Sequence, residues 1–537
     1  MTQSVGIESS EKALKMGKVS ATASFQLFAG TVLSTIILAI GTVVLMRLIS
    51  PEEYGLYAIA LIPSTTMILF RDLGVNTAMT KYIAQSRAQN KEDIKDIITV
   101  GLAFEILVGL AFSLISLLMA STLATTVFNR QELTPLIGLT SIAVFSGAVL
   151  AAAQSSFVGF ERMGLSGITT ICQSLVKGIA QPLLVLFIYG ALGATLGYVL
   201  SFLAAGIIGL VILYLTLFKN LKRTTQRKPE KSKTLKMMLK YGFPMSISAI
   251  LAGVLTQFYG FMMAFYCSDI VIGNYKAAMN FTVLLIFFTL PISTVLFPAF
   301  AKIDPQRERE LMKNVFASSV KYTAMLLVPA TLAIIVLSKP MISTLFGDQW
   351  VYAPVYLTLY VTSNLLVIFG SLSVTSFLTG LGETTMLMRL SGVSLLLGIP
   401  LAFLLIPAYG IMGAIIGNIL AGLPSVFWGL QWVRKHYEAK PDFRSSFRIF
   451  AASCIAAAIT YLPLSLLHSA EWIRLGLGGM IFILIYITAA PSIGALTQTD
   501  INNLRNMIPN LGFLSKLLNF PLIFAEKVLT ITSIIRK

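Results

Sequence analysis

The feature that most constrains this chain is a near-continuous series of apolar stretches, each about twenty residues or longer, separated by short polar breaks. A helix of roughly twenty apolar residues crosses the hydrocarbon of a bilayer, whereas a soluble core could not hide this much apolar surface. With 56% hydrophobic and 12% charged residues, most of the 537-residue chain must have lipid as its solvent. The sequence therefore predicts an all-α polytopic membrane protein with about 14 transmembrane helices.

The limits of these helices are predicted from the polar breaks and from the glycine and proline residues near them. The predicted spans lie near residues 22–48, 54–80, 97–121, 133–159, 164–189, 192–218, 239–267, 274–301, 314–338, 352–379, 384–406, 409–433, 446–466 and 472–496.

Successive polar breaks alternate between many and few basic residues. This alternation predicts the orientation of the chain in the membrane. If the N-terminus is cytoplasmic, 33 of the 40 lysines and arginines fall on the inner side and five on the outer side. Loops rich in Lys and Arg stay in the cytoplasm by the positive-inside rule. We therefore expect a multi-pass protein of the cell (cytoplasmic) membrane with both termini inside.

The same pattern predicts the domain organisation. A cytoplasmic leader, 1–21, precedes an N-lobe of six spans, 22–218; a basic linker, 219–238, leads to a C-lobe of six spans, 239–433. Two further spans, 446–496, and an amphipathic tail on the inner surface, 497–537, complete the chain.

An internal duplication supports the two lobes. Residues 189–197 and 409–417, about 220 positions apart, both read Y-G-x-x-G-A-x-x-G. Each half has an even number of spans, so the repeat is parallel, and substrate should lie between the lobes near the membrane midplane. The preferred interpretation of the glycines four residues apart in each copy is that they allow helices to pack closely.

Composition also excludes several function classes. The net charge of +17 is explained by inner loops that face anionic headgroups, so no nucleic-acid partner is expected. Three scattered cysteines and two histidines predict no disulfide framework and no metal site. The chain has no G-x-x-x-x-G-K-[ST] loop, so it is not expected to be an ATPase.

Several short motifs, in this order and spacing, resemble one known family. They are R-L-I-S-P-E-E-Y-G-L-Y at 47–57, D-L-G at 72–74, K-Y-I-A at 81–84, F-P-A at 297–299, L-F-G at 345–347 with Trp350, and I-P-A-Y-G-I-M-G-A at 406–414. The sequence resembles the polysaccharide-unit flippases of the multidrug/oligosaccharidyl-lipid/polysaccharide exporter superfamily.

This resemblance implies two six-helix lobes that enclose a cavity and move a polyprenyl (pyro)phosphate-linked oligosaccharide outward by alternating access, for polysaccharide or glycan biosynthesis. It implies no enzymatic activity and no cofactor, and it leaves a coupling ion, Na⁺ or H⁺, open. Membrane lipids and glycan polymerase or transferase machinery are the other expected partners.

Four ionisable residues lie inside predicted spans, where each costs at least about 2.5 kcal/mol to insert. They are Arg71, Asp72, Glu105 and Lys177. A guanidinium and an ammonium facing the cavity could bind the phosphate that joins lipid to sugar. For Arg71, an ion pair with Asp72 or Glu105 is an equal alternative; for Lys177, which has no carboxylate in its own helix, the cavity is the preferred interpretation.

Two more basic residues, Arg47 and Lys276, lie near the outer ends of their spans and could complete a basic path. Anchoring at the outer surface is the competing explanation for both. Amides such as Gln181 suit either sugar hydroxyls or interhelical hydrogen bonds.

Two other functions compete with the flippase. A cation-coupled multidrug exporter would need cavity carboxylates, and the first span has none. A membrane glycosyltransferase or ligase that uses a polyprenyl carrier would need an acidic metal site or a positioned base, and the outer breaks are too short to fold a catalytic domain.

Overall fold

A computed structural model describes residues 29–89, 93–188, 190–221, 231–285, 289, 296, 300–305, 307–507 and 523–530. The described part is helical and contains no strand. By its internal contacts the chain forms two compact units, Met1–Gly273 and Asn274–Lys537. The boundary lies inside a helix, Asp269–Asn280, rather than at the basic linker, so the helix that follows the linker packs with the first unit. The lobe limits drawn from the sequence stay a prediction.

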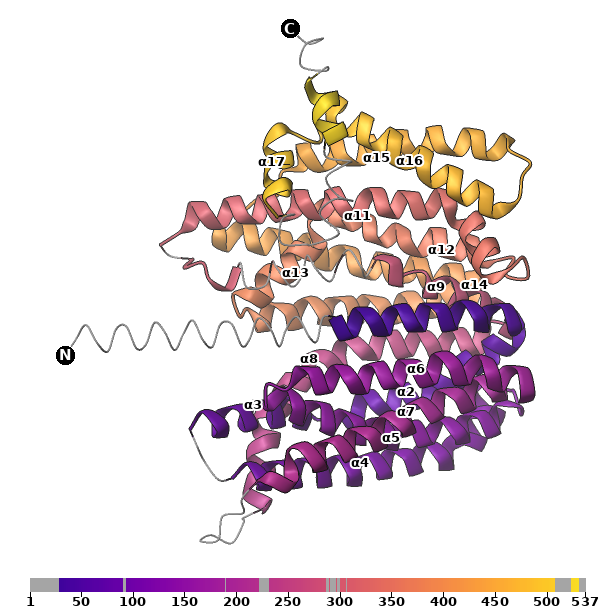
Figure 1. Ribbon diagram of the computed structural model, residues 1–537, viewed down its shortest axis with the longest axis vertical. Coiled ribbons are helices and arrows are strands. Elements are labelled where there is room, and N and C mark those ends of the chain that lie inside the picture. The colour runs from indigo at the N-terminus through magenta and orange to yellow at the C-terminus, as the bar shows by residue number, and fades with distance from the viewer. Residues whose placement is uncertain are drawn as a thin grey trace, which may run out of the picture. The chain divides into compact units, whose positions relative to one another are not determined.

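The first unit consists of long helices that pack along their lengths. After a first helix, Ala29–Leu48, it contains α2 (Pro51–Arg71), α3 (Val75–Ala88), α4 (Ile94–Thr122), α5 (Leu133–Gly159), α6 (Met163–Ile188), α7 (Gly190–Thr216) and α8 (Lys231–Tyr266). Figure 1 shows α4, α5, α6 and α7 running nearly parallel in this unit, and the pairs α4–α5, α5–α7 and α6–α7 are in extensive contact.

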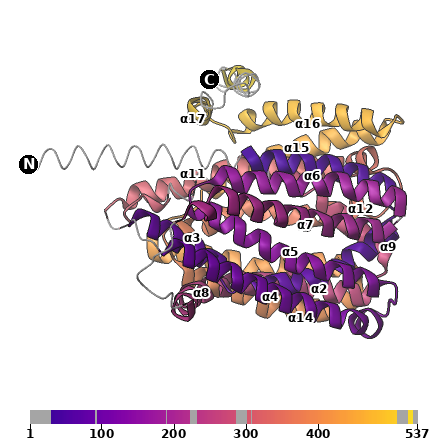
Figure 2. The same cartoon turned by 60° about the horizontal axis from the view of Figure 1, so that its bottom comes forward.

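The second unit begins within α9 (Asp269–Asn280). Its other helices are α11 (Arg309–Phe346), α12 (Ala353–Thr362), α13 (Ser371–Gly380), α14 (Thr384–Tyr437), α15 (Phe443–Leu466), α16 (Glu471–Ile493) and α17 (Gln498–Met507). In both views α15 and α16 form an adjacent pair, and both pack on α11 (Figures 1 and 2).

The described residues contain 11 helices long and apolar enough to cross a membrane, or 12 if the bent pair 353–369 and 371–380 is one span. The 54-residue α14 is two helices joined at Gly410, so it holds both predicted spans 384–406 and 409–433. Much of the predicted span 274–301 lies outside the described residues. The chain is thus a multi-pass helical membrane protein, and the number 14 stays a prediction.

The predicted span 54–80 is interrupted in the structure. α2 ends at Arg71, and α3 begins at Val75 after Gly74, whose φ of +80° is accessible to glycine and strained for most other residues. The Asp72 side chain accepts a hydrogen bond from the Gly74 N–H at 3.0 Å. The Gly74 and Gly242 backbones are in close contact, so α8 crosses the chain at this break.

Glycines set the helix spacing within the first unit. The first helix meets α6 where Gly30 faces Gly167 and Gly41 faces Gly178, backbone against backbone. Lipid supplies no hydrophobic force to bring helices together, so close van der Waals contact at small residues is a main source of association.

Both copies of the repeated motif form a similar turn. Gly190, before α7, has φ +65°, and Gly410, inside α14, has φ +57°. Three residues on, Gly193 packs against the Leu184 backbone and Gly413 against the Leu405 backbone. A side chain at either position would overlap a carbonyl of the preceding helix. These glycines therefore act in helix packing.

One arginine joins the ends of several helices in the first unit. Arg130 Nε lies 2.7 Å from Asp269 Oδ1, and its terminal nitrogens donate to the carbonyls of Ala264 and Cys267, both at 2.6 Å. The guanidinium thereby ties the α4–α5 connection to the end of α8 and the start of α9.

The start of the predicted tail is docked on the second unit. Lys321 of α11 pairs with the buried Asp500 of α17 at 2.6 Å, and Asp500 also accepts hydrogen bonds from the Thr497 N–H and hydroxyl. The remainder of the tail described by the structure is a helical segment, 523–530, which Arg505 of α17 reaches through Glu526.

The glycine contacts generate a stability prediction. A methyl group at Gly41 would overlap the Gly178 backbone, which cannot move like a flexible side chain. Gly41→Ala should therefore destabilise the folded protein by about 1–3 kcal/mol, the usual cost of overpacking. Thermal unfolding of the purified protein measures the change.

The matched control is Gly138→Ala, in a helix of the same unit, where the added methyl would meet only Leu117 at an ordinary 3.5 Å. It should be neutral, or stabilising by up to about 1 kcal/mol through helix propensity. Equal melting temperatures for the two variants would contradict the assigned contact.

Candidate functional site

A buried ion pair lies in the first unit, at the C-terminal end of α2. Arg71, the last residue of α2, has its Nη1 3.7 Å from Oε2 of Glu105 on α4. Arg71 is 4% exposed and Glu105 is fully buried. At this distance the two groups attract each other electrostatically, but they do not form a hydrogen bond.

Groups from two further helices complete this cluster. The Asn76 side chain of α3 donates to Glu105 Oε1 at 3.0 Å, and Arg71 Nη1 donates to the Val144 carbonyl of α5 at 3.4 Å. α3 begins at Val75, after the break at 72–74. Its second residue, Asn76, lies close to α4. Four helices thus meet at one pair of opposite charges, and Arg71 is directed into the unit.

Lys177 lies in a different setting on α6. Its side chain is half-buried, and its ammonium lies 5.3 Å from the centroid of the Tyr198 ring on α7, a cation–π distance. No carboxylate lies within ion-pair distance of Lys177 among the described residues. Lys177 is therefore a basic residue in the middle of a span that forms no ion pair within the described residues.

The surroundings of Lys177 are fixed by an aromatic and amide network. Gln181, one turn further along α6, donates to the Tyr57 hydroxyl of α2 at 2.9 Å and to the Ala194 carbonyl at 2.8 Å. The Tyr57 and Tyr198 rings meet edge to face with centroids 6.3 Å apart. Gly178, next to Lys177, lies against the first helix. This packing holds α6, and with it the base of the Lys177 side chain, in one position.

The remaining predicted site residues are placed apart from these clusters. Arg47 is exposed at the end of the first helix, and Asp72 is half-buried and caps the turn at Gly74. Lys276 belongs to the second unit, half-buried beside the Tyr275 ring at 5.9 Å. The structure brings Arg71 and Glu105 into contact; Lys177 forms a separate group with Tyr198. Substrate contact by these residues stays a prediction.

Three residues of these groups were not predicted to belong to a site: Asn76, Tyr198 and Tyr57, which the sequence analysis placed only in the motif at 47–57. One usable signal existed, because Lys177 and Gln181 are four residues apart and so share a face of α6. That face points to the helix carrying Tyr198, but nothing in the sequence identifies which tyrosine lies opposite.

The family follows from a comparison with known protein families. The model of the family described as "Polysaccharide biosynthesis protein" matches residues 21–304, more than half of the chain. The chain belongs to this polysaccharide biosynthesis family.

The match to an individual relative is consistent with this family. Over 275 residues, half of this chain, it is 21% identical to the probable low-salt glycan biosynthesis flippase Agl15 of Haloferax volcanii. The match covers 57% of that relative's length, so the chain spans little more than half of it.

Solved structures show the fold. A structure of the lipid II flippase MurJ in an inward closed conformation matches with a TM-score of 0.71 and 16% identity, covering 86% of this chain and 97% of that one. An inward-facing multidrug resistance MATE family transporter of the MOP superfamily matches with a TM-score of 0.64 and 15% identity, covering 76% and 94%. The family member described here therefore has the fold of these transporters.

The buried pair generates a second prediction. Removing one partner leaves the other charge buried and uncompensated, so Arg71→Met should destabilise the protein by about 3–5 kcal/mol. Replacing both charges, as in Arg71→Met/Glu105→Leu, should restore most of the loss, because two apolar side chains of similar volume need no partner. Thermal unfolding of the three proteins measures the coupling.

Additive losses in the double variant would show that Arg71 and Glu105 do not act as a pair. A double variant that is stable but inactive in transport would assign the pair a role in transport in addition to its contribution to stability.

Proposed function

We propose that this chain is a flippase that moves a lipid-linked oligosaccharide from the cytoplasmic to the outer leaflet for polysaccharide or glycan biosynthesis. Lys177 carries the proposal: a half-buried cation in the middle of a span, held beside Tyr198 and without a carboxylate partner among the described residues. A cation costs free energy in a span, and this one is not neutralised by pairing. An anionic ligand would offset that cost.

The ligand chemistry follows from the residue types around Lys177. An ammonium is a compact point charge that suits a phosphate, and aromatic and amide groups nearby suit a saccharide, which offers both apolar faces and hydroxyls. A polyprenyl (pyro)phosphate-linked oligosaccharide combines these two features. The relative from Haloferax volcanii, named as a probable glycan biosynthesis flippase, supports the same substrate class.

In this proposal transport proceeds by alternating access, with the lipid tail remaining in the bilayer while the headgroup crosses. Such a step breaks and forms no covalent bond, so the protein acts as a transporter and not as an enzyme. The inner leaflet of the cytoplasmic membrane is the source of substrate, and both termini lie on that side. Glycan polymerase or transferase machinery would use the exported product.

The membrane potential is a sufficient energy source. Moving roughly two negative charges outward across an inside-negative membrane releases on the order of 4–5 kcal/mol per 100 mV. A coupling ion, Na⁺ or H⁺, is not required by this arithmetic, and imposed ion gradients in the transport assay would reveal one.

The second candidate function is multidrug export. The similarity of the fold to that of a MATE family transporter supports it. A cationic drug needs a carboxylate that is free to receive it. Of the two acids predicted within spans, Glu105 is paired with Arg71 and Asp72 caps Gly74. The charge pattern therefore favours the flippase.

The test is translocation of a fluorescent polyprenyl-pyrophosphate oligosaccharide in proteoliposomes. Lys177→Ala should lower the initial rate at least about tenfold, the effect of losing a charge-assisted contact worth about 1.5 kcal/mol or more. Lys177→Arg, which keeps the positive charge, should retain more of the rate than Lys177→Ala.

Lys339→Ala removes an exposed cation of the second unit and should leave the rate unchanged. Size-exclusion profiles establish that each variant is folded. Absence of transport of several such lipids by the wild type, together with ion-driven efflux of an organic cation, would replace the flippase by the multidrug exporter.

A further inference from the structure

A proline interrupts the hydrogen-bond ladder of α11 inside its predicted span, 314–338. Pro329 has no N–H, so the carbonyl of Met325, four residues earlier, lacks the donor that an α-helix would supply. Pro329 is buried, and Met325 is 7% exposed. Hydrocarbon contains no water to replace a missing donor, so a carbonyl left without one is costly in a span.

A tyrosine of another helix supplies the missing donor. The Tyr486 hydroxyl of α16 donates to the Met325 carbonyl at 3.2 Å. No other side chain donates to that carbonyl among the residues that the structure describes. Both residues lie inside predicted spans, away from the polar breaks, so this hydrogen bond joins two membrane-spanning helices. Neighbouring helices commonly satisfy the backbone groups that a proline frees in this way.

The C-terminal helices contact α11 at a second polar point close by. Lys321, one turn before Met325, pairs with the buried Asp500 of α17 at 2.6 Å. α15 and α16 also pack along α11 (Figures 1 and 2). The polar contacts between α11 and these helices therefore fall in one short stretch, which ends just before the proline.

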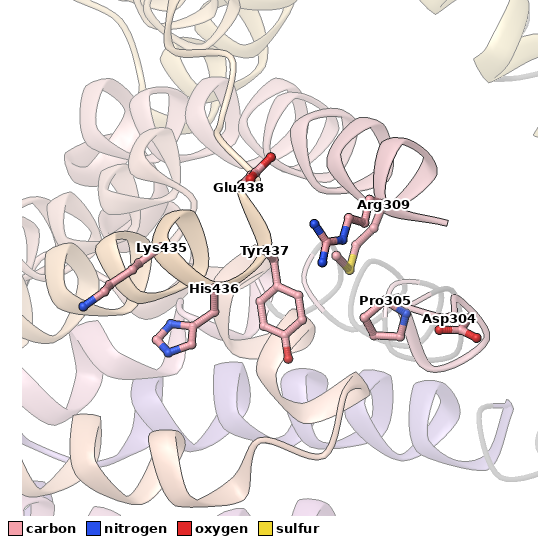
Figure 3. Close-up of a pocket in the computed structure, with 8 residues that line it drawn as sticks. Asp304, Pro305, Arg309, Lys435, His436, Tyr437 and Glu438 are labelled. Atoms are coloured by element: carbon pink, nitrogen blue, oxygen red, sulfur yellow. The ribbon is translucent and has the colours of Figure 1, made fainter. Parts of the chain in front are cut away.

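The first part of α11 is held at its start by α14. Lys313 pairs with Glu438, the residue that follows α14, at 2.8 Å. Figure 3 shows the cavity between these helix ends, with Arg309 of α11 and Tyr437 of α14 in its lining. Because this end is held, bending of α11 at Pro329 would move the part of the helix that follows the proline.

The predicted internal repeat has no such arrangement in its first half. α4 and α11 are the third predicted spans of the two halves, and α4 contains no proline. The two further spans, α15 and α16, follow the second half, whereas the basic linker follows the first. A proline in the third span and a helix pair that supplies its missing donor thus occur together, in the same half.

We propose that Pro329 is a hinge in α11 and that the Tyr486 hydroxyl is a latch, the contact that keeps the hinge closed. With the hydroxyl bound, the Met325 carbonyl has a donor. When the hydroxyl leaves, the two parts of α11 are joined by one hydrogen bond fewer, and they bend more easily relative to each other. The α15–α16 pair thereby controls the bend of the helix on which it packs. The proposal does not depend on the transported substrate.

The experiment compares single and double variants of the purified full-length protein by hydrogen–deuterium exchange with mass spectrometry. Tyr486→Phe removes only the hydroxyl and keeps the ring. Pro329→Ala gives the backbone an N–H at the position from which an α-helix donates to the Met325 carbonyl. Peptides that cover α11 report how readily its amides open.

In the wild-type background, Tyr486→Phe should raise the exchange rate of the α11 amides next to Pro329 about fivefold, the factor that corresponds to a hydrogen bond of about 1 kcal/mol. In the Pro329→Ala background, the same substitution should leave the rate unchanged, because the backbone then supplies the donor. The matched control, Tyr461→Phe, removes the hydroxyl of an exposed tyrosine of α15 and should change neither rate.

Equal acceleration by Tyr486→Phe in both backgrounds would show that the hydroxyl adds general stability, and it would overturn the latch. No acceleration in the wild-type background would overturn it as well. If Tyr486→Phe does not fold, Pro329→Ala alone remains informative. It should slow exchange of the same amides, and an unchanged or faster rate would refute the hinge.

Discussion

Backbone-to-backbone contact at glycine is the interaction on which the first unit depends. In lipid there is little hydrophobic gain from bringing two apolar helices together, so close packing and polar contacts must hold them. α6 shows the consequence, because Gly178 touches the first helix while Gly197 of α7 approaches the Gln181 backbone. Lys177 directly precedes the first of these contacts on α6 and lies one turn before the second. Lys177 is thus carried by a helix whose backbone is in close contact with two neighbouring helices next to it.

The helical architecture could be predicted from the sequence because its causes are local. Apolar length defines a span, and glycine spacing in residues 189–197 and 409–417 defines the tight turns and the packing that follow. The interruption at Gly74 could not be predicted in the same way. Apolar residues continue across it, and what requires a break there is the crossing of α8, more than 160 residues further along the chain.

The candidate site was predictable only in part, for a similar reason. Arg71, Glu105 and Lys177 stand out because charges are rare and costly in apolar helices. Their partners depend on how each helix is rotated and how far it is shifted, which a single sequence does not contain. Asn76, Tyr57 and Tyr198 are ordinary residues for a span, and only the fold shows that they contact the charged groups.

The pairing of Arg71 with Glu105 also bears on how the chain enters the membrane during synthesis. Each charge alone adds about 2.5–3.5 kcal/mol to the cost of inserting its helix. The two residues lie on consecutive spans, so the partner of Arg71 leaves the ribosome about 34 residues after it. An α2–α4 hairpin that partitions as one unit presents no net charge from this pair to the lipid. The order of residues along the chain therefore favours insertion of these spans together and not one at a time.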